Sequence, residues 1–204
     1  KRIFMGFPFK ELVLASYNQH KIKEFRTIFA PLNLKITAQS DLEVNAAPEP
    51  YSTFLENALT KARHASKITQ KAALADDSGI CALALEGAPG VQSARFAGDN
   101  ARDSDNRRQL ATLLADKEDK SVFYYCILVL IRHPEDPTPL IAEGRLYGQW
   151  LMEGRGENGF GYDPNFYLPE RKKTVAELSL AEKNQISHRA KAVEKLLALL
   201  TKLS

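Results

Sequence analysis

Two adjacent carboxylates, Asp76 and Asp77, follow a short apolar run and precede Ser78 and Gly79. Neighbouring carboxylates repel each other and are costly to remove from water. A pair beside an apolar strand therefore favours a hard cation such as Mg²⁺, which prefers oxygen ligands. One of the two could also accept a proton from an attacking water molecule. A solvated acidic turn closed by Gly79 explains the same residues equally well, and we expect the pair at a strand end or at a break between strands.

Two further carboxylates lie upstream of this pair. Thr53 and Glu56 have the spacing of a capping box, and apolar residues recur at helical spacing after them, which predicts a helix of about 16 residues. Glu56 is therefore expected to cap this helix rather than to bind a ligand. Glu49 has no such assignment.

A polar segment joins the apolar run Leu12–Ala15 to apolar residues that recur at helical spacing from Ile22 onward. In this strand–loop–helix order, the helix start offers free N–H groups and a partial positive charge to a phosphate. Hydroxyl, amide and ammonium groups beside it suit a polyphosphate. An ordinary polar connection is the alternative, because the segment is not a Walker motif. The candidate residues are Ser16, Tyr17, Asn18, Gln19, His20 and Lys21.

Two later segments could bind a base or a carbonyl group. The most glycine-dense stretch of the chain, residues 154–161, leads into Phe160 and Tyr162, and an exposed aromatic ring between glycines can stack on a base. A tight turn whose aromatic rings fold back into the core is the alternative. Further along, Lys183, His188 and Arg189 lie near a helix start and could donate to a carbonyl or phosphate oxygen, unless they form a solvated helical face.

These four groups are the parts that a metal-dependent nucleoside triphosphate hydrolase requires. The elements that position them predict an α/β fold, in which a mixed central sheet is flanked by helices. The clearest strand is Val122–Ile131, and after a proline-rich connection Leu140–Leu151 is expected to pair back antiparallel with it. Helices are expected over Asp103–Asp116 and after Ser187. We expect residues 11–204 to form a single domain and residues 1–10 to be an N-terminal extension or a cloning remnant.

Composition narrows the class of protein without naming a ligand. The chain has 204 residues, 44% of them hydrophobic and 26% charged, which excludes collagenous, coiled-coil and disordered proteins. A formal net charge of +3 is too small to imply a nucleic-acid partner. The longest apolar run is too short for a transmembrane helix, and no secretory signal is recognisable at the N-terminus, so we expect a cytoplasmic protein without a membrane partner. The thiols of Cys81 and Cys126 are expected to be buried and reduced.

Taken together, the motifs closely resemble the inosine triphosphate pyrophosphatase family, which converts ITP, dITP and XTP to the monophosphate and pyrophosphate. The ordered set is much more specific than any one motif. The resemblance implies an elongated mixed α/β fold with two lobes around a substrate cleft, and a homodimer. The matching signatures run along the chain as Ser16-x-Asn-x-x-Lys21, Phe54-x-Glu-Asn57, Ala75-Asp-Asp-Ser-Gly79, Gly87-Ala-Pro-Gly90, Ser93-Ala-Arg-Phe96, Gly159-Phe-Gly-Tyr-Asp-Pro164 and Ser187-His-Arg189.

The resemblance also implies roles at the phosphate end of the substrate. Asp77 is the expected Mg²⁺ ligand and general base, Asp76 supports it, and Glu49 is a second metal carboxylate. The residues expected to hold the triphosphate are Ser16, Asn18, Lys21 and Lys61. Tyr17 stands where the family generally has glycine.

At the base end, the resemblance implies that Phe160 stacks on the purine and that Ser78 contacts the substrate. The residues expected to line the base pocket or to read the base are Gly161, Tyr162, Asp163, Lys183, His188 and Arg189. Donors from His188 or Arg189 would favour the 6-carbonyl group of hypoxanthine and xanthine over the 6-amino group of adenine. We identify no residue that would reject the 2-amino group of guanine.

The mechanism compatible with these roles is attack on the α-phosphorus by a water molecule that Asp77 positions, with pyrophosphate as the leaving group. A related Maf-type nucleotide pyrophosphatase is one alternative. A nucleotide-sensing module without catalytic activity is another, although a sensor has no use for Asp76 and Asp77 together with Lys21 and Lys61.

Overall fold

A computed structural model describes residues 9–30 and 34–202. The chain divides into two compact units, each built from separate segments. Unit 1 takes the chain up to Asp77, the segment Cys126–Gly144 and the chain from Arg189 onward, and unit 2 takes Ser78–Tyr125 and Arg145–His188. Most of the N-terminal extension expected at residues 1–10 lies outside the described residues.

Strands and α-helices alternate along the described chain up to its fourth strand, as in an α/β fold, and three more strands and then two α-helices follow. The strands are β1 (Glu11–Leu14), β2 (Lys35–Ala38), β3 (Ala73–Ala82), β4 (Ser121–Ile131), β5 (Leu140–Trp150), β6 (Phe166–Leu168) and β7 (Lys173–Thr174). The α-helices are α1 (Gln19–Phe29), α2 (Phe54–Thr69), α3 (Asp103–Leu114), α4 (Leu180–Ile186) and α5 (His188–Leu200). The predicted elements are therefore present, with ends that differ by one or two residues.

Within the described residues, the strands form one seven-stranded sheet in the order β2-β1-β3-β4-β5-β6-β7. β1 runs parallel to β2 and to β3, whereas β6 runs antiparallel to β5 and to β7. Next to β4, the N–H of Trp150 at the end of β5 donates to the carbonyl oxygen of Lys120 over 2.7 Å, as the predicted hairpin requires. The expected mixed sheet is confirmed.

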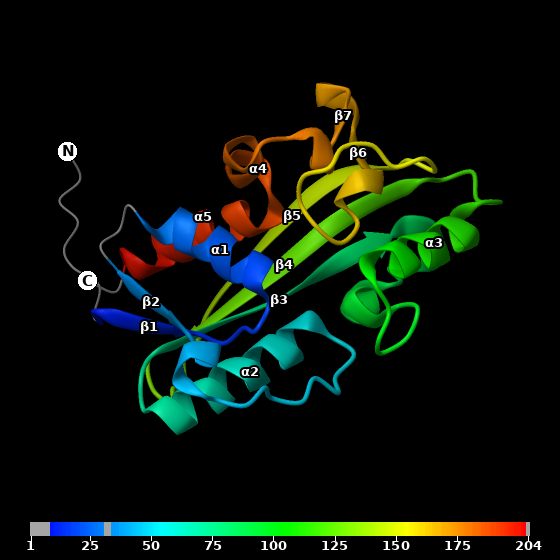
Figure 1. Ribbon diagram of the computed structural model, residues 1–204. Coiled ribbons are helices and arrows are strands. Elements are labelled where there is room, and N and C mark those ends of the chain that lie inside the picture. The colour runs from blue at the N-terminus through cyan, green and yellow to red at the C-terminus, as the bar shows by residue number, and fades with distance from the viewer. Residues whose placement is uncertain (1–8, 31–33, 203–204) are drawn as a thin grey trace. The chain divides into compact units, whose positions relative to one another are not determined.

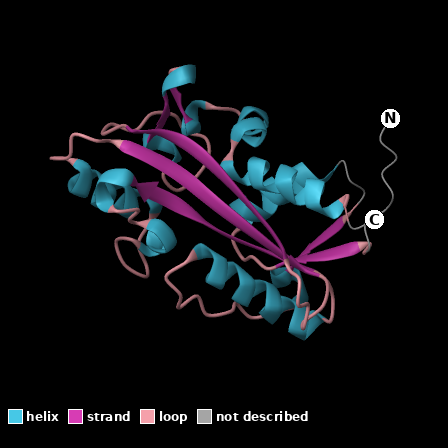
Figure 2. Cartoon of the chain, turned by 180° about the vertical axis from the view of Figure 1, so that it is seen from behind, coloured by secondary structure: helices cyan, strands magenta, loops and turns pink. Residues whose placement is uncertain are grey.

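The core of unit 1 lies between its strands and three helices. In Figures 1 and 2, α1 and α5 lie side by side on one face of the unit 1 strands, and α2 lies on the other face. Phe25 and Phe29 of α1 are buried together with Leu196 of α5 and Leu128 of β4. α2 is capped by Thr53, whose Oγ1 accepts from the N–H of Glu56, and it buries a stripe of small residues that allows close packing on the sheet. Thr53 Oγ1 also donates to the Glu56 carboxylate over 2.6 Å, so Glu56 lies in the first turn of α2 and contacts the N-cap side chain.

Unit 2 has a separate core. Leu110 and Leu114 of α3 are buried against Val122 and Tyr124 of β4 and Trp150 of β5. The buried residues of β4 alternate along its first half, so Val122 and Tyr124 face this core. No helix of the described residues is long and apolar enough to cross a membrane.

The acidic pair occupies a different place from the one predicted. Asp76 and Asp77 lie inside β3, a continuous strand of 10 residues, and not at its end or at a break. Charged residues and Gly79 are unfavourable inside a strand, which is why the sequence predicted an interruption. The structure instead buries both carboxylates beside cations that come from distant parts of the chain.

Candidate active site

The predicted phosphate segment forms the start of α1 in unit 1. Asn18 is the N-cap residue: its Oδ1 accepts from the N–H of His20 over 3.0 Å and of Lys21 over 3.2 Å. Ser16 Oγ accepts in turn from the N–H of Asn18 over 3.2 Å. Asn18 therefore fixes where the helix begins, and with it the position of Lys21. Gln19 and His20 are exposed in the first turn.

The hydroxyl of Tyr17 donates to the backbone carbonyl of Val44. This contact ties the polar segment to the loop before α2, while part of the Tyr17 ring remains exposed. The side chain that stands where the family generally has glycine is thus a structural tether here.

Asp76 is held by two cations. Lys21 Nζ lies 3.0 Å from its Oδ1, and a guanidinium nitrogen of Arg189 lies 3.3 Å from its Oδ2. Arg189 also donates to the carboxylate of Glu24, which lies on α1. Asp76 and Arg189 are each 1% exposed and Glu24 is 3% exposed, so water screens these ion pairs very little. The thiol of Cys126 lies 3.9 Å from Asp76 Oδ2, and both cysteines are buried and free, as predicted.

Asp77 is held by one lysine. Lys61 Nζ lies 3.2 Å from Asp77 Oδ1 and 3.0 Å from Glu49 Oε2, so the same ammonium group bridges both carboxylates. Among the described residues, no hydrogen-bond partner reaches the buried Oδ2 of Asp77. We refer to the following residues as the unit 1 ionic cluster: Lys21, Glu24, Glu49, Lys61, Asp76, Asp77 and Arg189.

The two members of the acidic pair differ in pKa. Burial alone would raise the pKa of Asp76, but Lys21 and Arg189 outweigh it and hold that pKa below its usual range. Burial raises the pKa of Asp77, and the charges of Glu49 and Asp76 add to the effect, while Lys61 and Lys21 compensate only in part. Two carboxylates with divergent pKa values are the usual arrangement when one remains ionised and the other exchanges a proton.

In unit 2, Asp163 organises the predicted base-binding residues. Its Oδ2 accepts from Lys183 Nζ over 2.9 Å and from the N–H of Phe160 over 3.0 Å, and its Oδ1 accepts from the hydroxyl of Tyr124 over 2.9 Å. Lys183 Nζ also lies 4.6 Å from the centroid of the Phe160 ring. Gly159 makes this turn possible because it has φ +79°, and a Cβ there would lie 2.2 Å from Asp163 Oδ2. The structure therefore brings Phe160, Asp163 and Lys183 together.

His188 joins this group through a ring contact. Its imidazole stacks on the Tyr124 ring with centroids 4.8 Å apart. Tyr124 also stacks on the ring of Phe166, with centroids 4.3 Å apart. Tyr162, by contrast, is buried in the unit 2 core and its hydroxyl donates to the carbonyl of Ser93 over 2.7 Å. For Tyr162 the alternative of a ring folded into the core is therefore confirmed, whereas Phe160 is only partly buried.

Arg189, for which the family resemblance implied a role in reading the base, is paired with carboxylates of unit 1. Its guanidinium lies among carboxylates of unit 1, where Asp76 and Glu24 compensate its charge. Ser78 follows Asp77 in β3 and is the first residue of unit 2.

Two residues of the site, Glu24 and Tyr124, carry no local sequence signal. Glu24 looks like an ordinary polar position on α1, and nothing local marks it as buried. Tyr124 lies within the apolar run that predicts a strand, so its hydroxyl contact with Asp163 has no sequence signal either.

The carboxylates of unit 1 suit a hard cation. Among the described residues no group of three or more His, Cys, Asp and Glu side chains could by itself hold a metal ion. Mg²⁺, however, usually binds one or two carboxylates together with substrate phosphates and water. The unpartnered Oδ2 of Asp77 is a buried oxygen of the type that such a cation prefers.

The chain is similar to known proteins over most of its length. A model of the Ham1 family matches residues 12–199. A dITP/XTP pyrophosphatase of Neisseria meningitidis is 54% identical over 189 residues, covering 92% of this chain and 95% of the relative. One from Chromobacterium violaceum is 53% identical over 196 residues, covering 96% and 100%. Among solved structures, a HAM1 protein from Coxiella burnetii has a TM-score of 0.88 at 45% identity, covering 95% of this chain and 100% of that one.

Proposed function

The chain belongs to the Ham1 family, and from this membership and the geometry of its site we propose that it hydrolyses non-canonical purine nucleoside triphosphates, ITP, dITP and XTP, to the monophosphate and pyrophosphate. The observation that carries the proposal is the buried acidic pair in unit 1. Asp76 is kept ionised by Lys21 and Arg189, while burial raises the pKa of Asp77. Such a pair suits water activation beside a polyanion.

Asp77 acts as the general base in this mechanism. It takes a proton from the water molecule that attacks the α-phosphorus, and the bond from that phosphorus to the oxygen bridging to the β-phosphate breaks, so pyrophosphate leaves. Lys21 and Lys61 place positive charge beside the phosphate oxygens, where negative charge develops. The role of Asp76 is to hold Lys21 in place.

Asp77 and Glu49 are the residues that would hold Mg²⁺, with Asp76 supporting them. When bound, the cation would neutralise negative charge on the phosphate oxygens. The support for this assignment is the partner-free Oδ2 of Asp77 and the lysine that links Asp77 to Glu49.

We assign base recognition to unit 2. Phe160 offers a partly buried ring for stacking, Lys183 is a donor beside that ring, and His188 is a second donor that stacks on Tyr124. A donor that faces the 6-carbonyl group of hypoxanthine would face the 6-amino group of adenine in ATP, and such a mismatch can discriminate by orders of magnitude. For Arg189 the contacts favour holding Asp76 over reading the base. We also propose that the protein is a homodimer and that it acts in the cytoplasm.

A substrate panel tests this function. Release of pyrophosphate and of orthophosphate is measured from ITP, XTP, dITP, ATP and GTP, each with Mg²⁺ and with EDTA. We expect pyrophosphate as the first product, no turnover in EDTA, and kcat/KM for ITP at least about 100-fold above that for ATP. Orthophosphate as the first product would contradict attack at the α-phosphorus, and equal kcat/KM for ITP and ATP would contradict base discrimination.

A further inference from the structure

The peptide groups on both sides of Gly161 are held by one helix of unit 2. The N–H of Gly161 donates to Oδ2 of Asp103 over 2.7 Å, and the guanidinium of Arg107 donates to the carbonyl oxygen of Gly161 over 2.7 Å. Both partners are charged and both distances are short, so these are charge-assisted hydrogen bonds. Neither Asp103 nor Arg107 belongs to the predicted site.

The sequence of α3 explains how the helix makes both bonds. Asp103 is the first residue of α3, where the helix dipole favours a carboxylate, and Arg107 stands four residues later on the same face. Leu110 and Leu114 continue that face and are fully buried in the unit 2 core. The two leucines anchor the helix, and its first two turns reach the Gly161 backbone.

The backbone held in this way carries Phe160. Gly161 has φ +62°, a left-handed conformation that few side chains tolerate. Because glycine itself can adopt many backbone conformations, contacts from other residues are needed to hold it in this one. The N–H of Phe160 donates to the Asp163 carboxylate. Tyr162, which follows Gly161, donates from its hydroxyl to the carbonyl oxygen of Ser93. Asp103 and Arg107 complete the set of bonds that fixes this turn.

We propose that Asp103 and Arg107 are positioning residues for base recognition: they clamp the Gly161 backbone so that the Phe160 ring is already oriented when the purine arrives. This role rests on the proposed function, in which Phe160 stacks on the base. A turn ordered in advance loses less entropy on binding, so the clamp lowers KM for the nucleotide without taking part in the chemistry. Neither residue is a catalytic residue, because neither contacts the reacting atoms.

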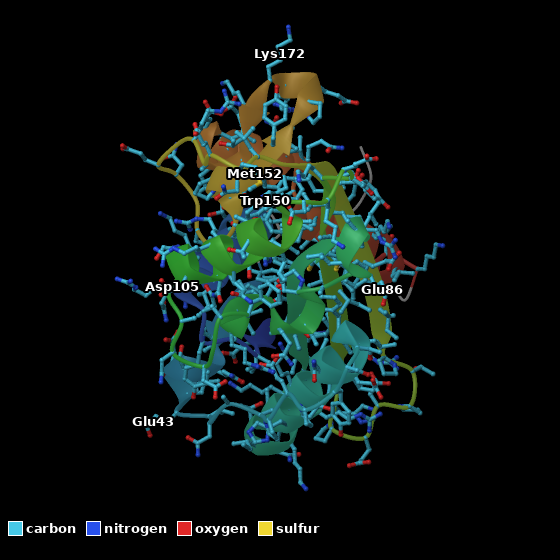
Figure 3. All side chains as sticks on the ribbon, turned by 90° about the vertical axis from the view of Figure 1, so that its right-hand side faces the viewer. Glu43, Glu86, Asp105, Trp150, Met152 and Lys172 are labelled. Carbon is cyan, nitrogen blue, oxygen red and sulfur yellow. The ribbon has the colours of Figure 1, made fainter. Side chains whose placement is uncertain are left out.

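Variants of α3 test the clamp. Asp103→Ala and Arg107→Ala each remove one side of it, while Asp103→Asn keeps an acceptor oxygen for the Gly161 N–H. Arg108→Ala is the matched control, because Arg108 contacts Asp105, 3.8 Å away, on another face of the same helix. Figure 3 labels Asp105 at the outer side of α3. All four changes leave Leu110 and Leu114 in place, so α3 keeps its core contacts.

Two measurements are made on each variant. Hydrogen–deuterium exchange follows the amides of residues 159–163, and kinetics with ITP give kcat and KM separately. We expect the two clamp variants to exchange faster in this segment and to raise KM roughly fivefold with kcat within about twofold of the unaltered protein. Asp103→Asn and Arg108→Ala are expected to remain close to the unaltered protein in both measurements.

Inhibition by inorganic tripolyphosphate, which lacks a base, separates the clamp from a general loss of structure. Its inhibition constant is expected to be the same in every variant. The clamp would be overturned if Asp103→Ala and Arg107→Ala left amide exchange or KM for ITP unchanged. It would also be overturned if these variants weakened tripolyphosphate inhibition as much as they raise KM for ITP. Failure of the proposed function would look different, because the unaltered protein itself would not hydrolyse ITP, and the role in base binding would fall with it.

Discussion

The guanidinium of Arg189 lies 3.3 Å from the Asp76 carboxylate, although the two residues are 113 positions apart in the chain. Lys21 approaches the other oxygen of the same carboxylate, so Asp76 is paired on both sides. Asp77, its neighbour, is paired on one oxygen only. Because of this asymmetry, we assign Asp76 the role of an ionised residue that holds Lys21 and Asp77 the role of the base. The first two predictions follow from this assignment.

Asp77→Asn is expected to lower kcat by at least about 100-fold, because the amide cannot accept the proton of the attacking water. Pyrophosphate release from ITP measures the effect, and circular dichroism confirms that the variant is folded. Glu56→Gln is a suitable control, since Glu56 belongs to the same unit but its carboxylate accepts from Thr53 at the start of α2. Full activity in Asp77→Asn would place the general base elsewhere.

Asp76→Asn is expected to destabilise the protein more than Asp77→Asn does. The first change leaves the buried guanidinium of Arg189 and the ammonium of Lys21 facing a neutral amide, and breaking a buried ion pair costs about 3–5 kcal/mol. The second change removes a carboxylate whose pKa burial already raises, and Lys61 keeps Glu49 as a partner. Urea unfolding measures both free energies, and equal losses would contradict the asymmetry.

Glu11 gives unit 1 an acid-sensitive contribution to stability. Hydrogen bonds from Lys71, Lys35 and Thr37 lower its pKa from 4.5 to about 2. Because the folded pKa lies below the unfolded one, this stabilisation is complete above about pH 4.5 and is lost as the pH falls toward about 2. Glu11 is partly exposed, so the contribution is about 1 kcal/mol.

The measurement is the difference in Tm between the unaltered protein and Glu11→Gln across this pH range. The difference is expected to be present at pH 7 and to shrink steadily below about pH 4.5. Glu170→Gln, at an exposed position of unit 2, controls for the general effect of removing one acid. A difference that is independent of pH would refute the role of the Glu11 charge.

Gly159→Ala is expected to raise KM for ITP, because the added Cβ would lie 2.2 Å from Asp163 Oδ2 and would displace the carboxylate that holds Lys183. Gly98→Ala is the matched control: Gly98 also lies in unit 2 and has a positive φ, but nothing lies within 4 Å of its added Cβ. Both variants carry backbone strain of about 1–3 kcal/mol, and only Gly159→Ala also adds a clash. Steady-state kinetics distinguish the two, and a larger KM in Gly98→Ala than in Gly159→Ala would contradict this account.

Local sequence patterns predicted the elements well and the contacts between distant residues poorly. Thr53 and the residues after it predicted α2 because caps and helical spacing act over a few residues. The β-branched and aromatic residues of the apolar run Val122–Ile131 likewise predicted β4. These signals arise from interactions between residues that are close in the sequence, so they can be recognised without the fold.

The interruption predicted at Asp76 and Asp77 was wrong for the opposite reason. The local cost of two charges in a strand is offset by Lys21, Lys61 and Arg189, and no local pattern shows that these cations converge there. The same holds for Glu24, whose partner Arg189 lies 165 positions away. A buried ion pair of this kind is visible only after the fold is known.

The position of Arg189 at the start of α5 also bears on how the protein is made. A nascent chain that ends after α4 already contains Asp76 and Glu24, but neither the guanidinium that they share nor the α5 residues that fill the unit 1 core, Ala192, Val193 and Leu196. Burying those two carboxylates before Arg189 is synthesised would leave them without the guanidinium that both contact, with Lys21 as the cation beside Asp76. We therefore expect Asp76 and Glu24 to reach their folded arrangement only after α5 has left the ribosome, so that the part of the molecule to which we assign catalysis forms late.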